Sequence, residues 1–547
     1  MKSEKLKIRI GVLRTALLLA AWGWLTLESW AQPADEWREP TFPRREVRAV
    51  WLATIGGIDW PRTKATDASG VERQKRELCQ ILDQLQYAHI NAVVLQTRVR
   101  GTVIYPSDIE PWDDCLTGSF GRSPGYDPLA FAIDECHRRG MELHAWVVSI
   151  PLGTVQKQRA YGSRSITRQR PELCKQAGQD FFMKPAERGT ADYIAALCLE
   201  MATRYDIDGI SLDYIRYPES TYGFRDGCSA QEKRDNITRI VRRVHEAVKG
   251  VKPWVKLSSS PIGKYADLAR YSAGGWNCYN GVFQDPQAWL REGIQDMLLP
   301  MMYFRGDQFY PFLYDWQEHS QGRPVAPGLG IYFLDPREGR WTLDEVRAQM
   351  HAARNSGIGG MIFYRSDFLT RNCKGIYKTV CQEFFPYPAL MPRMTWMGDT
   401  LPPAAPQKLL HTGNVLMWEQ PGVAGLKEKG GVTFNIYGSD VYPVDTERAD
   451  NLLRTGLRDT VVLLDGVLAG KRYLAVCAMD RFGNESAAAQ EKEMAKRPDW
   501  RKAWNPQSRI GDNGKREDDR SKWYKSSKWK RLKSVSGTIV RKPNFLF

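Results

Sequence analysis

Short apolar runs alternate with amphipathic stretches between about residues 46 and 385 of the chain. Short apolar runs are typical of buried parallel strands, and the amphipathic stretches between them are typical of surface helices. The predicted strands are Glu46–Thr54, Asn91–Val99, Met141–Ser149, Gly209–Tyr217, Val255–Gly263, Asp296–Tyr303, Pro324–Tyr332 and Gly359–Ser366. The predicted helices lie near residues 71–88, 128–139, 190–205, 230–249, 285–293, 308–320, 342–356 and 373–384. Eight repeats of this size predict an α/β fold, a (β/α)8 barrel over residues 44–390.

An open, doubly wound sheet is the competing α/β architecture. It would be expected to carry a glycine-rich phosphate-binding turn after its first strand. The turn here, residues 53–59 (Ala-Thr-Ile-Gly-Gly-Ile-Asp), lacks that spacing of glycines. The barrel is therefore the preferred prediction.

A second domain is predicted after a proline-dense linker at residues 397–406, because prolines at this density interrupt helices and strands alike. Short strands follow at Leu409–Trp418, Thr433–Ser439, Thr460–Leu464 and Tyr473–Asp480. In its entering prolines, in Trp418 and in its closing strand and turn, the segment at residues 398–490 resembles a fibronectin type III domain, a small all-β sandwich. Its expected role is to space the barrel or hold it near a surface.

Both ends of the chain look like appendages. Residues 1–31 combine five basic residues, a short apolar run and a Ser-Trp-Ala sequence, as a secretory signal peptide does. The alternative, a membrane anchor, is disfavoured because the apolar run is shorter than the roughly 20 residues that span a bilayer. We therefore expect an exported protein, periplasmic or extracellular, with no transmembrane segment after signal cleavage.

The net charge of +15 is concentrated at the two ends. Residues 491–547 carry a surplus of 10 basic over acidic residues and residues 1–31 a surplus of 3, which leaves about +2 for the body. A basic groove for nucleic acid is therefore not expected. The tail at residues 495–547 is predicted to be disordered, although its tryptophans among basic residues leave open a role in binding anionic polymers.

The ten cysteines are scattered, with no CxxC pair and no histidine at zinc-finger spacing. A structural zinc site is therefore disfavoured. No metal and no organic cofactor is expected.

The active site of a (β/α)8 barrel lies at the carboxyl ends of its strands, so the polar residues there are the first candidates. On the fourth strand, Gly209, Ser211 and Asp213 share one face, which places Asp213 at the mouth of the barrel. A carboxylate is costly to bury unless it is paired or used in chemistry. The alternative for Asp213 is a structural ion pair with Arg216 or Arg98. Asp206 and Asp208 are expected to cap the preceding turn.

Other polar and aromatic residues near the strand ends form a candidate sugar-binding set. Tryptophan and tyrosine rings stack on sugar faces, and imidazole and amide groups bond to hydroxyls. The alternative for each of these residues is ordinary packing in the core. The candidates are Gln96, Arg98, Tyr105, His144, Trp146, Arg216, Tyr303 and Tyr364.

Many ordered stretches resemble the glycosyl-hydrolase-like 10 family of bacterial exported proteins, which is a (β/α)8 family. They are Arg48–Trp51, Asn91–Arg98, Tyr105–Ser107, Glu110–Trp112, Leu116–Gly118, Gly125–Leu129, His137–Gly140, Leu143–Trp146, Tyr205–Pro218, Gln284–Asp285 with Trp289, and Pro300–Tyr303. The resemblance covers nearly all of residues 44–385. It implies an exported glycoside hydrolase that cleaves O-glycosidic bonds in a polysaccharide, with bacterial cell-wall glycan (peptidoglycan) as a possible substrate.

The resemblance makes Asp213 the family's acidic residue at the end of the fourth strand. Many members carry two successive acids there, whereas Tyr214 follows Asp213 in this chain. Glycoside hydrolysis uses two carboxyl groups, and the fifth strand ends in serines rather than in a glutamate. We therefore predict that Asp213 is the nucleophile or base and Asp285 the general acid.

Asp285 has an alternative role, because an aspartate before a proline is a common helix N-cap. Glu219, Asp307 and Glu110 are the further candidates for the second acid. Asp296 should enter the sixth strand from the opposite end and is expected to be structural.

Two other functional classes compete with the hydrolase. A glycan-binding barrel without turnover, acting as an envelope adaptor, is favoured by the single acid on the fourth strand. A metal-dependent polysaccharide deacetylase is disfavoured, because its Asp/His pairs cannot be assembled from the seven histidines at their positions.

Overall fold

The computed structural model describes residues 42–422 and 430–490, and it confirms the eight-stranded parallel barrel. The strands are β1 (Val47–Leu52), β2 (Ala92–Arg98), β3 (Glu142–Val148), β7 (Gly209–Asp213), β8 (Lys256–Ser259), β9 (Met297–Leu298), β10 (Gly328–Leu329) and β11 (Gly360–Phe363). Their order in the sheet is β10-β11-β1-β2-β3-β7-β8-β9. Parallel bridges from Leu298 to Val325 and from Met301 to Gly328 join the two edges, so the sheet closes on itself.

The barrel strands are buried on both faces. Every residue of β1, β2 and β7 is buried, which explains why the sequence shows continuous apolar runs instead of strict alternation. Inside the barrel, Val47, Ala49, Trp51 and Ile362 belong to one small apolar cluster. The outward-facing side chains belong to a larger cluster that the surrounding helices complete.

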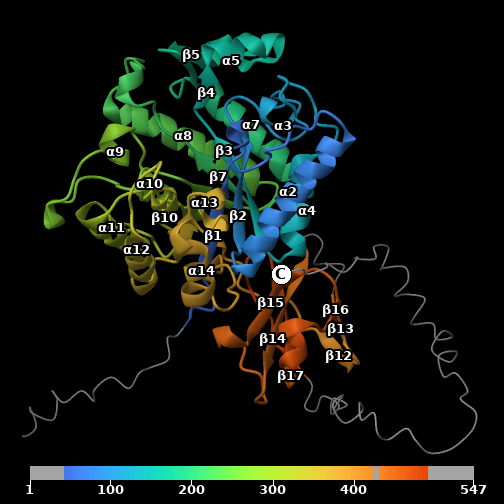
Figure 1. Ribbon diagram of the computed structural model, residues 1–547. Coiled ribbons are helices and arrows are strands. Elements are labelled where there is room, and N and C mark those ends of the chain that lie inside the picture. The colour runs from blue at the N-terminus through green and yellow to red at the C-terminus, as the bar shows by residue number, and fades with distance from the viewer. Residues whose placement is uncertain (1–41, 423–429, 491–547) are drawn as a thin grey trace, which may run out of the picture. The chain divides into compact units, whose positions relative to one another are not determined.

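The helices of the barrel match the predicted stretches closely, and in Figure 1 they surround the central strands. They are α2 (Ala68–Tyr87), α4 (Pro128–Arg138), α7 (Arg188–Arg204), α8 (Ala230–Lys249), α10 (Pro286–Glu292), α11 (Tyr310–Glu318), α12 (Leu343–Asn355) and α14 (Ile376–Thr379). Local sequence sets several starts: Asp127 caps α4 before Pro128, and Ser229 with Glu232 forms a capping box on α8. The predicted helix at 373–384 is shorter, because α14 passes into a π-helical turn at Val380–Phe384.

An insertion after β3 was not predicted. It contains α5 (Val155–Ala160) and a small antiparallel sheet of β4 (Pro151–Thr154), β6 (Asp180–Met183) and β5 (Cys174–Ala177), in the order β4-β6-β5. Its strands have only four residues each, so their hydrophobic pattern is too short to be recognised.

The second region contains two antiparallel sheets and the short helix α16 (Gly466–Gly470) among the described residues. One sheet contains β12 (Gln407–Thr412), β13 (Val415–Glu419) and β16 (Val461–Leu463), and the other contains β15 (Leu452–Leu457), β14 (Val432–Ser439), β17 (Tyr473–Asp480) and β18 (Ala489–Gln490). The single predicted strand Leu409–Trp418 is wrong: it is a hairpin, turned at Gly413 with a φ of 61°. Trp418 packs edge-to-face on Phe434, with ring centroids 5.1 Å apart.

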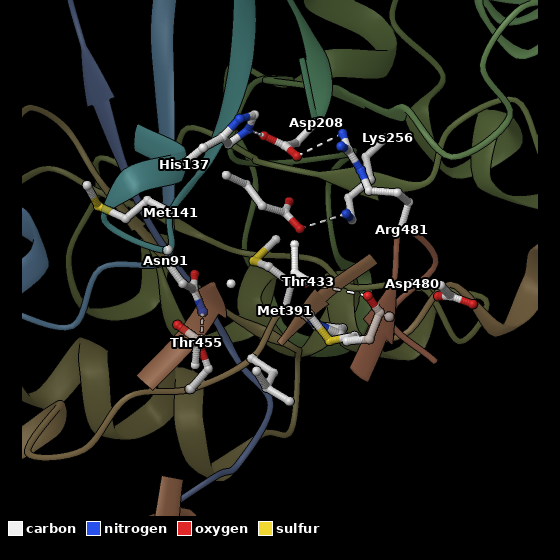
Figure 2. Close-up of a pocket in the computed structure, with 18 of the residues that line it drawn as sticks. Asn91, His137, Met141, Asp208, Lys256, Met391, Thr433, Thr455, Asp480 and Arg481 are labelled. Atoms are coloured by element: carbon white, nitrogen blue, oxygen red, sulfur yellow. Dashed lines mark hydrogen bonds and ion pairs between the residues drawn. The ribbon is translucent and has the colours of Figure 1, made fainter. Parts of the chain in front are cut away.

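Ion pairs join this β region to the amino-terminal end of the barrel strands. Asp208 binds His137 Nε2 at 2.7 Å and Arg481 Nη2 at 3.0 Å, and Figure 2 shows these two partners on either side of it. Asp206 pairs with Arg458 and Arg481 at 2.8 and 2.9 Å. The prediction that Asp206 and Asp208 cap a local turn is therefore wrong. Both carboxylates instead bind distant residues, and Arg458 and Arg481 lie more than 250 positions away in the chain.

The predicted signal peptide at residues 1–31 and the predicted disordered tail at residues 495–547 lie outside the described residues. All ten cysteines lie among the described residues, and each is a free thiol. No helix in the described part of the chain is long and apolar enough to cross a membrane.

Candidate active site

An open cavity of about 430 Å³ lies at the carboxyl ends of the barrel strands. Its floor and walls come from seven of the eight strands, β8 excepted, or from the residues that follow them in the chain. The lining residues are Ala53, Ile55, Gln96, Arg100, Trp146, Val148, Asp213, Tyr214, Met301, Tyr303, Tyr332, Glu338, Tyr364, Arg365 and Phe368. This is the end of the barrel at which the active sites of (β/α)8 enzymes are found.

Asp213, the last residue of β7, is a carboxylate held by three neutral donors. Trp146 Nε1 donates to Oδ2 at 2.9 Å, and Ser260 Oγ and the Tyr214 amide donate to Oδ1 at 2.9 and 2.8 Å. Its exposed fraction is 4%. The alternative predicted for Asp213, an ion pair with Arg216 or Arg98, is not what these residues form: Arg98 pairs with Glu110 and Arg216 with Glu219.

Burial raises the pKa of Asp213, and the three donors together with the charge of Arg216 offset only part of that effect. Tyr214 has a φ of 48°, in the left-handed region that a tyrosine rarely adopts. This turn is what lets the Tyr214 amide reach back to the carboxylate. Strain of this kind at the end of a strand is characteristic of functional sites.

Tyrosine rings form one wall of the cavity. Tyr364 packs on Tyr303 with centroids 5.3 Å apart, and Tyr332 meets both edge-to-face at 5.7 Å. Trp51, beneath the cavity, meets Tyr364 at 5.8 Å. Such a wall offers apolar faces for a sugar ring and hydroxyl groups for its oxygens.

Four of the predicted sugar-binding residues line the cavity with Asp213: Gln96, Trp146, Tyr303 and Tyr364. Gln96 is oriented by the backbone, because its Oε1 accepts from the amides of Thr54 and Ile55 at 3.0 and 2.8 Å. A fifth, Arg216, lines an adjoining pocket.

Arg98 does not line this cavity. The register between β2 and β3 shifts between Gln96 and Arg98, and this irregularity breaks the two-residue alternation that had placed both residues on one face. Arg98 is instead fully buried, with its guanidinium bound to Glu110 at 2.7 and 2.9 Å and to the carbonyl of Ser149.

His144 and Tyr105 are also buried and away from the cavity lining. His144 faces the barrel interior one layer below Trp146, where its ring occupies the space that a side chain at Gly209 would need. Tyr105 is fully buried and packs edge-to-face on Tyr205 at 5.8 Å. In the structure, Arg98 and His144 have polar partners in Glu110 and Glu142, and Tyr105 has a packing contact, so their predicted roles in substrate binding stay untested.

Asp285 is not among the residues that line the cavity. It caps α10: its Oδ1 accepts from the Ala288 amide at 3.1 Å and from Tyr265 Oη at 2.9 Å. This is the alternative that the Asp-Pro sequence left open, and the predicted general-acid role of Asp285 stays without a direct test.

The further acid candidates are also spread out. Glu110 is buried against Arg98, Glu219 lines the adjoining pocket, and Asp307 lies in the turn Gly306–Gln308. Asp296 is structural, as predicted: it pairs with Lys249 at 2.6 Å and accepts from the Leu257 amide.

Glu338 is the functional candidate that the sequence analysis missed. Among the residues lining this cavity, Asp213 and Glu338 are the two with carboxyl groups. Glu338 follows β10 on the exposed loop after the turn Ile331–Leu334. It lies near Tyr332, whose pKa is raised to about 12 by burial and by the charge of Glu338. The sequence did offer one signal for Glu338: it is an acidic residue in the loop after the seventh barrel strand, at the end of the barrel where active sites lie.

Ser260 was missed for a different reason. It is the last of three successive serines at the end of the fifth strand, which by themselves indicate no function, yet its hydroxyl donates a hydrogen bond to Asp213. In the described part of the chain, no group of His, Cys, Asp and Glu side chains is arranged to hold a metal ion.

A closed parallel barrel with a buried acid and a tyrosine-lined cavity at the carboxyl ends of its strands is an arrangement that suits the class of barrel glycoside hydrolases. The family model of glycosyl hydrolase-like 10 matches residues 46–329. The chain therefore belongs to the glycosyl hydrolase-like 10 family, as its sequence motifs predicted.

Two relatives are similar over most of their length. Glycosyl hydrolase YngK of Bacillus subtilis is 30% identical over 389 residues, which is 65% of this chain and 75% of the relative. Glycosyl hydrolase DigH of Escherichia coli O6:H1 is 30% identical over 421 residues, 68% of this chain and 95% of the relative. Among solved structures, the PgaB (BpsB) glycoside hydrolase domain from Bordetella bronchiseptica matches 62% of this chain and 98% of its own, at 16% identity and a TM-score of 0.41.

Proposed function

We propose that the protein is a glycoside hydrolase that cleaves O-glycosidic bonds in a polysaccharide, with Asp213 and Glu338 as its two carboxyl groups. The observation that carries the proposal is the state of Asp213. It is nearly buried, held by three neutral donors and not neutralised by an ion pair, at the floor of an aromatic cavity. A fold does not retain such a carboxyl group without cost, and catalysis is the common reason for it.

The roles follow from the positions of the two acids. A carboxyl group with a raised pKa keeps its proton to higher pH, so Asp213 is suited to protonate the leaving oxygen. Glu338, on the exposed loop, can take a proton from the water that attacks the anomeric carbon. The glycosidic C–O bond breaks, the C–O bond to water forms, and each acid exchanges one proton. This assignment reverses the role predicted for Asp213 and moves the second acid from Asp285 to Glu338.

The substrate and its location are part of the same proposal. Glycan strands of the bacterial cell wall would meet an enzyme that the signal-like residues 1–31 export. The β region, which we propose to be a fibronectin type III-like domain, would hold the barrel close to such a surface. Its ion pairs to the barrel through Arg481 and Arg458 support a contact between the two regions.

A second candidate is a glycan-binding adaptor without turnover. It is favoured by one observation: β8 ends in serines, where many barrel glycosidases carry an acid, so the second carboxyl group must come from an exposed loop. An adaptor would use the same tyrosine wall to bind sugar.

The two candidates are separated by assaying the purified protein for new reducing ends on peptidoglycan and on common polysaccharides. We expect reducing ends that disappear in Asp213→Asn, whereas an adaptor binds glycan and releases none. Binding without release on every glycan tested would overturn the hydrolase proposal.

The second acid is tested by comparing Glu338→Gln with Asp285→Asn. Loss of rate in the first variant and near-normal rate in the second is expected, because Asp285 lies outside the cavity lining. Azide should restore turnover to Glu338→Ala if that residue activates the nucleophile. A larger loss in Asp285→Asn, with its fold intact by circular dichroism, would return the catalytic role to Asp285.

A further inference from the structure

A second pocket adjoins the catalytic cavity. Arg100 and Tyr214 line both, so the two hollows share a wall immediately beside Asp213. The second pocket continues between the insertion after β3 and the loop after β7, where Phe182, Tyr217 and Tyr222 line it. Aromatic faces therefore extend away from the cavity in one direction.

Arg216 lies in this second pocket with unused hydrogen-bonding capacity. Its exposed fraction is 6%, and its Nη2 pairs with Glu219 at 3.3 Å. Its Nε and Nη1 are buried and have no hydrogen-bond partner among the described residues. Unpaired donors on a buried guanidinium are costly, and an oxygen-rich ligand would satisfy them.

An exposed tryptophan continues the same surface. The indole of Trp276, on the loop after β8, lies against the Arg216 guanidinium at 5.4 Å and is 47% exposed. Gly281 supports it from below, because a side-chain carbon there would come within 2.9 Å of the indole. The same guanidinium also lies over the Tyr214 ring, at 4.7 Å. Trp276 is thus a fixed, exposed ring rather than a core residue.

We propose that the second pocket and Trp276 form further sugar-binding subsites, so that the glycan extends from the catalytic cavity across Tyr214 and Arg216 to Trp276. The inference rests on the proposed function, and it adds the substrate class: a linear chain several sugars long, bound across the cleavage point and cut internally. The pocket holds charged side chains of both signs: Arg100 and Arg216 can donate to sugar hydroxyl and carbonyl oxygens, and Asp180 and Glu219 can accept from sugar hydroxyls.

The test compares chain lengths on one enzyme. Oligosaccharides from disaccharide to hexasaccharide, prepared from peptidoglycan glycan strands and from chitin, are assayed with the full chain and with Trp276→Ala. Loss of one stacking platform should lower kcat/KM on the hexasaccharide about tenfold and leave the disaccharide within about twofold. The matched control is Tyr87→Ala, which removes an exposed ring at the carboxyl end of α2, outside both pockets.

Gly281→Ala provides a second variant, because it displaces the Trp276 ring without removing it, and it should show the same dependence on length. Equal losses on short and long chains in both variants, or no loss on either, would overturn the subsite proposal while leaving the hydrolase proposal intact. Calorimetric binding of the hexasaccharide to Asp213→Asn tests the subsites without turnover: Trp276→Ala in that background should weaken binding about tenfold. Unchanged binding would also overturn the subsites.

Discussion

Asp208 and Asp213 lie five positions apart, before and at the end of β7, and the barrel treats them in opposite ways. Both are nearly buried, with exposed fractions of 7% and 4%. Burial alone would raise the pKa of Asp208, but the charges of His137 and Arg481 outweigh it and hold that pKa well below its usual value. Burial raises the pKa of Asp213, which has neutral donors instead of a paired cation beside it.

The difference teaches what each end of the barrel does. At the amino-terminal end of the strands the carboxylate is neutralised by ion pairs that connect the barrel to the β region. At the carboxyl-terminal end the carboxyl group is left without such a pair and faces a cavity. In barrels of this class the first end contributes stability and the second carries chemistry.

The largest expected effect is on turnover. Asp213→Asn should lower kcat about a thousandfold, because the group that exchanges a proton with the substrate is lost. Asp208→Asn should change kcat less than about threefold, since its contacts are at the other end of the barrel. Reducing-end release under saturating glycan measures both. Comparable losses in the two variants would erase the functional distinction between the two ends.

Stability should show the reverse order. Asp208→Asn removes the buried charge that pairs with both His137 and Arg481, and it should lower the free energy of unfolding by about 3 kcal/mol. The control is Arg458→Met, whose pair with Asp206 is half exposed and contributes less than about 1 kcal/mol. Urea unfolding followed by fluorescence gives both values. If the control costs as much as Asp208→Asn, burial of the pair does not set its strength.

The pH dependence of stability sharpens the comparison. A carboxyl group with a lowered folded-state pKa stabilises the fold above its unfolded pKa of about 3.9, and that contribution is lost as the pH falls through the folded value. The gap in melting temperature between the wild type and Asp208→Asn should therefore narrow below about pH 3.9. A gap that is constant from neutral pH to pH 3 would show that the charge of Asp208 is not its source. The effect of Asp213 on stability has the opposite pH dependence. Because its folded-state pKa is raised, its contribution to the free energy of unfolding falls as the pH rises.

The smallest expected effect concerns one donor to Asp213. Trp146→Phe removes a hydrogen bond that favours the carboxylate, so the pKa of Asp213 should rise further. If Asp213 is the proton donor, the alkaline limb of the kcat profile moves to higher pH by up to about one unit. Tyr332→Phe, which keeps all three donors, should leave the limb in place. A limb that moves to lower pH in Trp146→Phe would contradict the acid role.

The sequence determined much of the fold because each strand and helix of the barrel carries its own local pattern. All eight strands and seven of the eight helices were predicted in the right places, although β9 and β10 have two residues each within longer predicted strands, and the family was recognised from its motifs. Asp213 was found because a two-residue period and the end of a strand are local properties. The short strands β4, β5 and β6 had no such pattern.

The tertiary structure alone decided which polar residues share the cavity. Arg98 does not reach the cavity because the pairing register of β2 shifts before it. His144 lies one layer too deep in the barrel, and Asp285 caps a helix outside the cavity lining. Closure of the barrel brought Glu338 and Asp213, 125 positions apart in the chain, into one cavity. The sequence sets the face on which a side chain lies, whereas long-range packing sets its depth and its partners, and these control its charge and its chemistry.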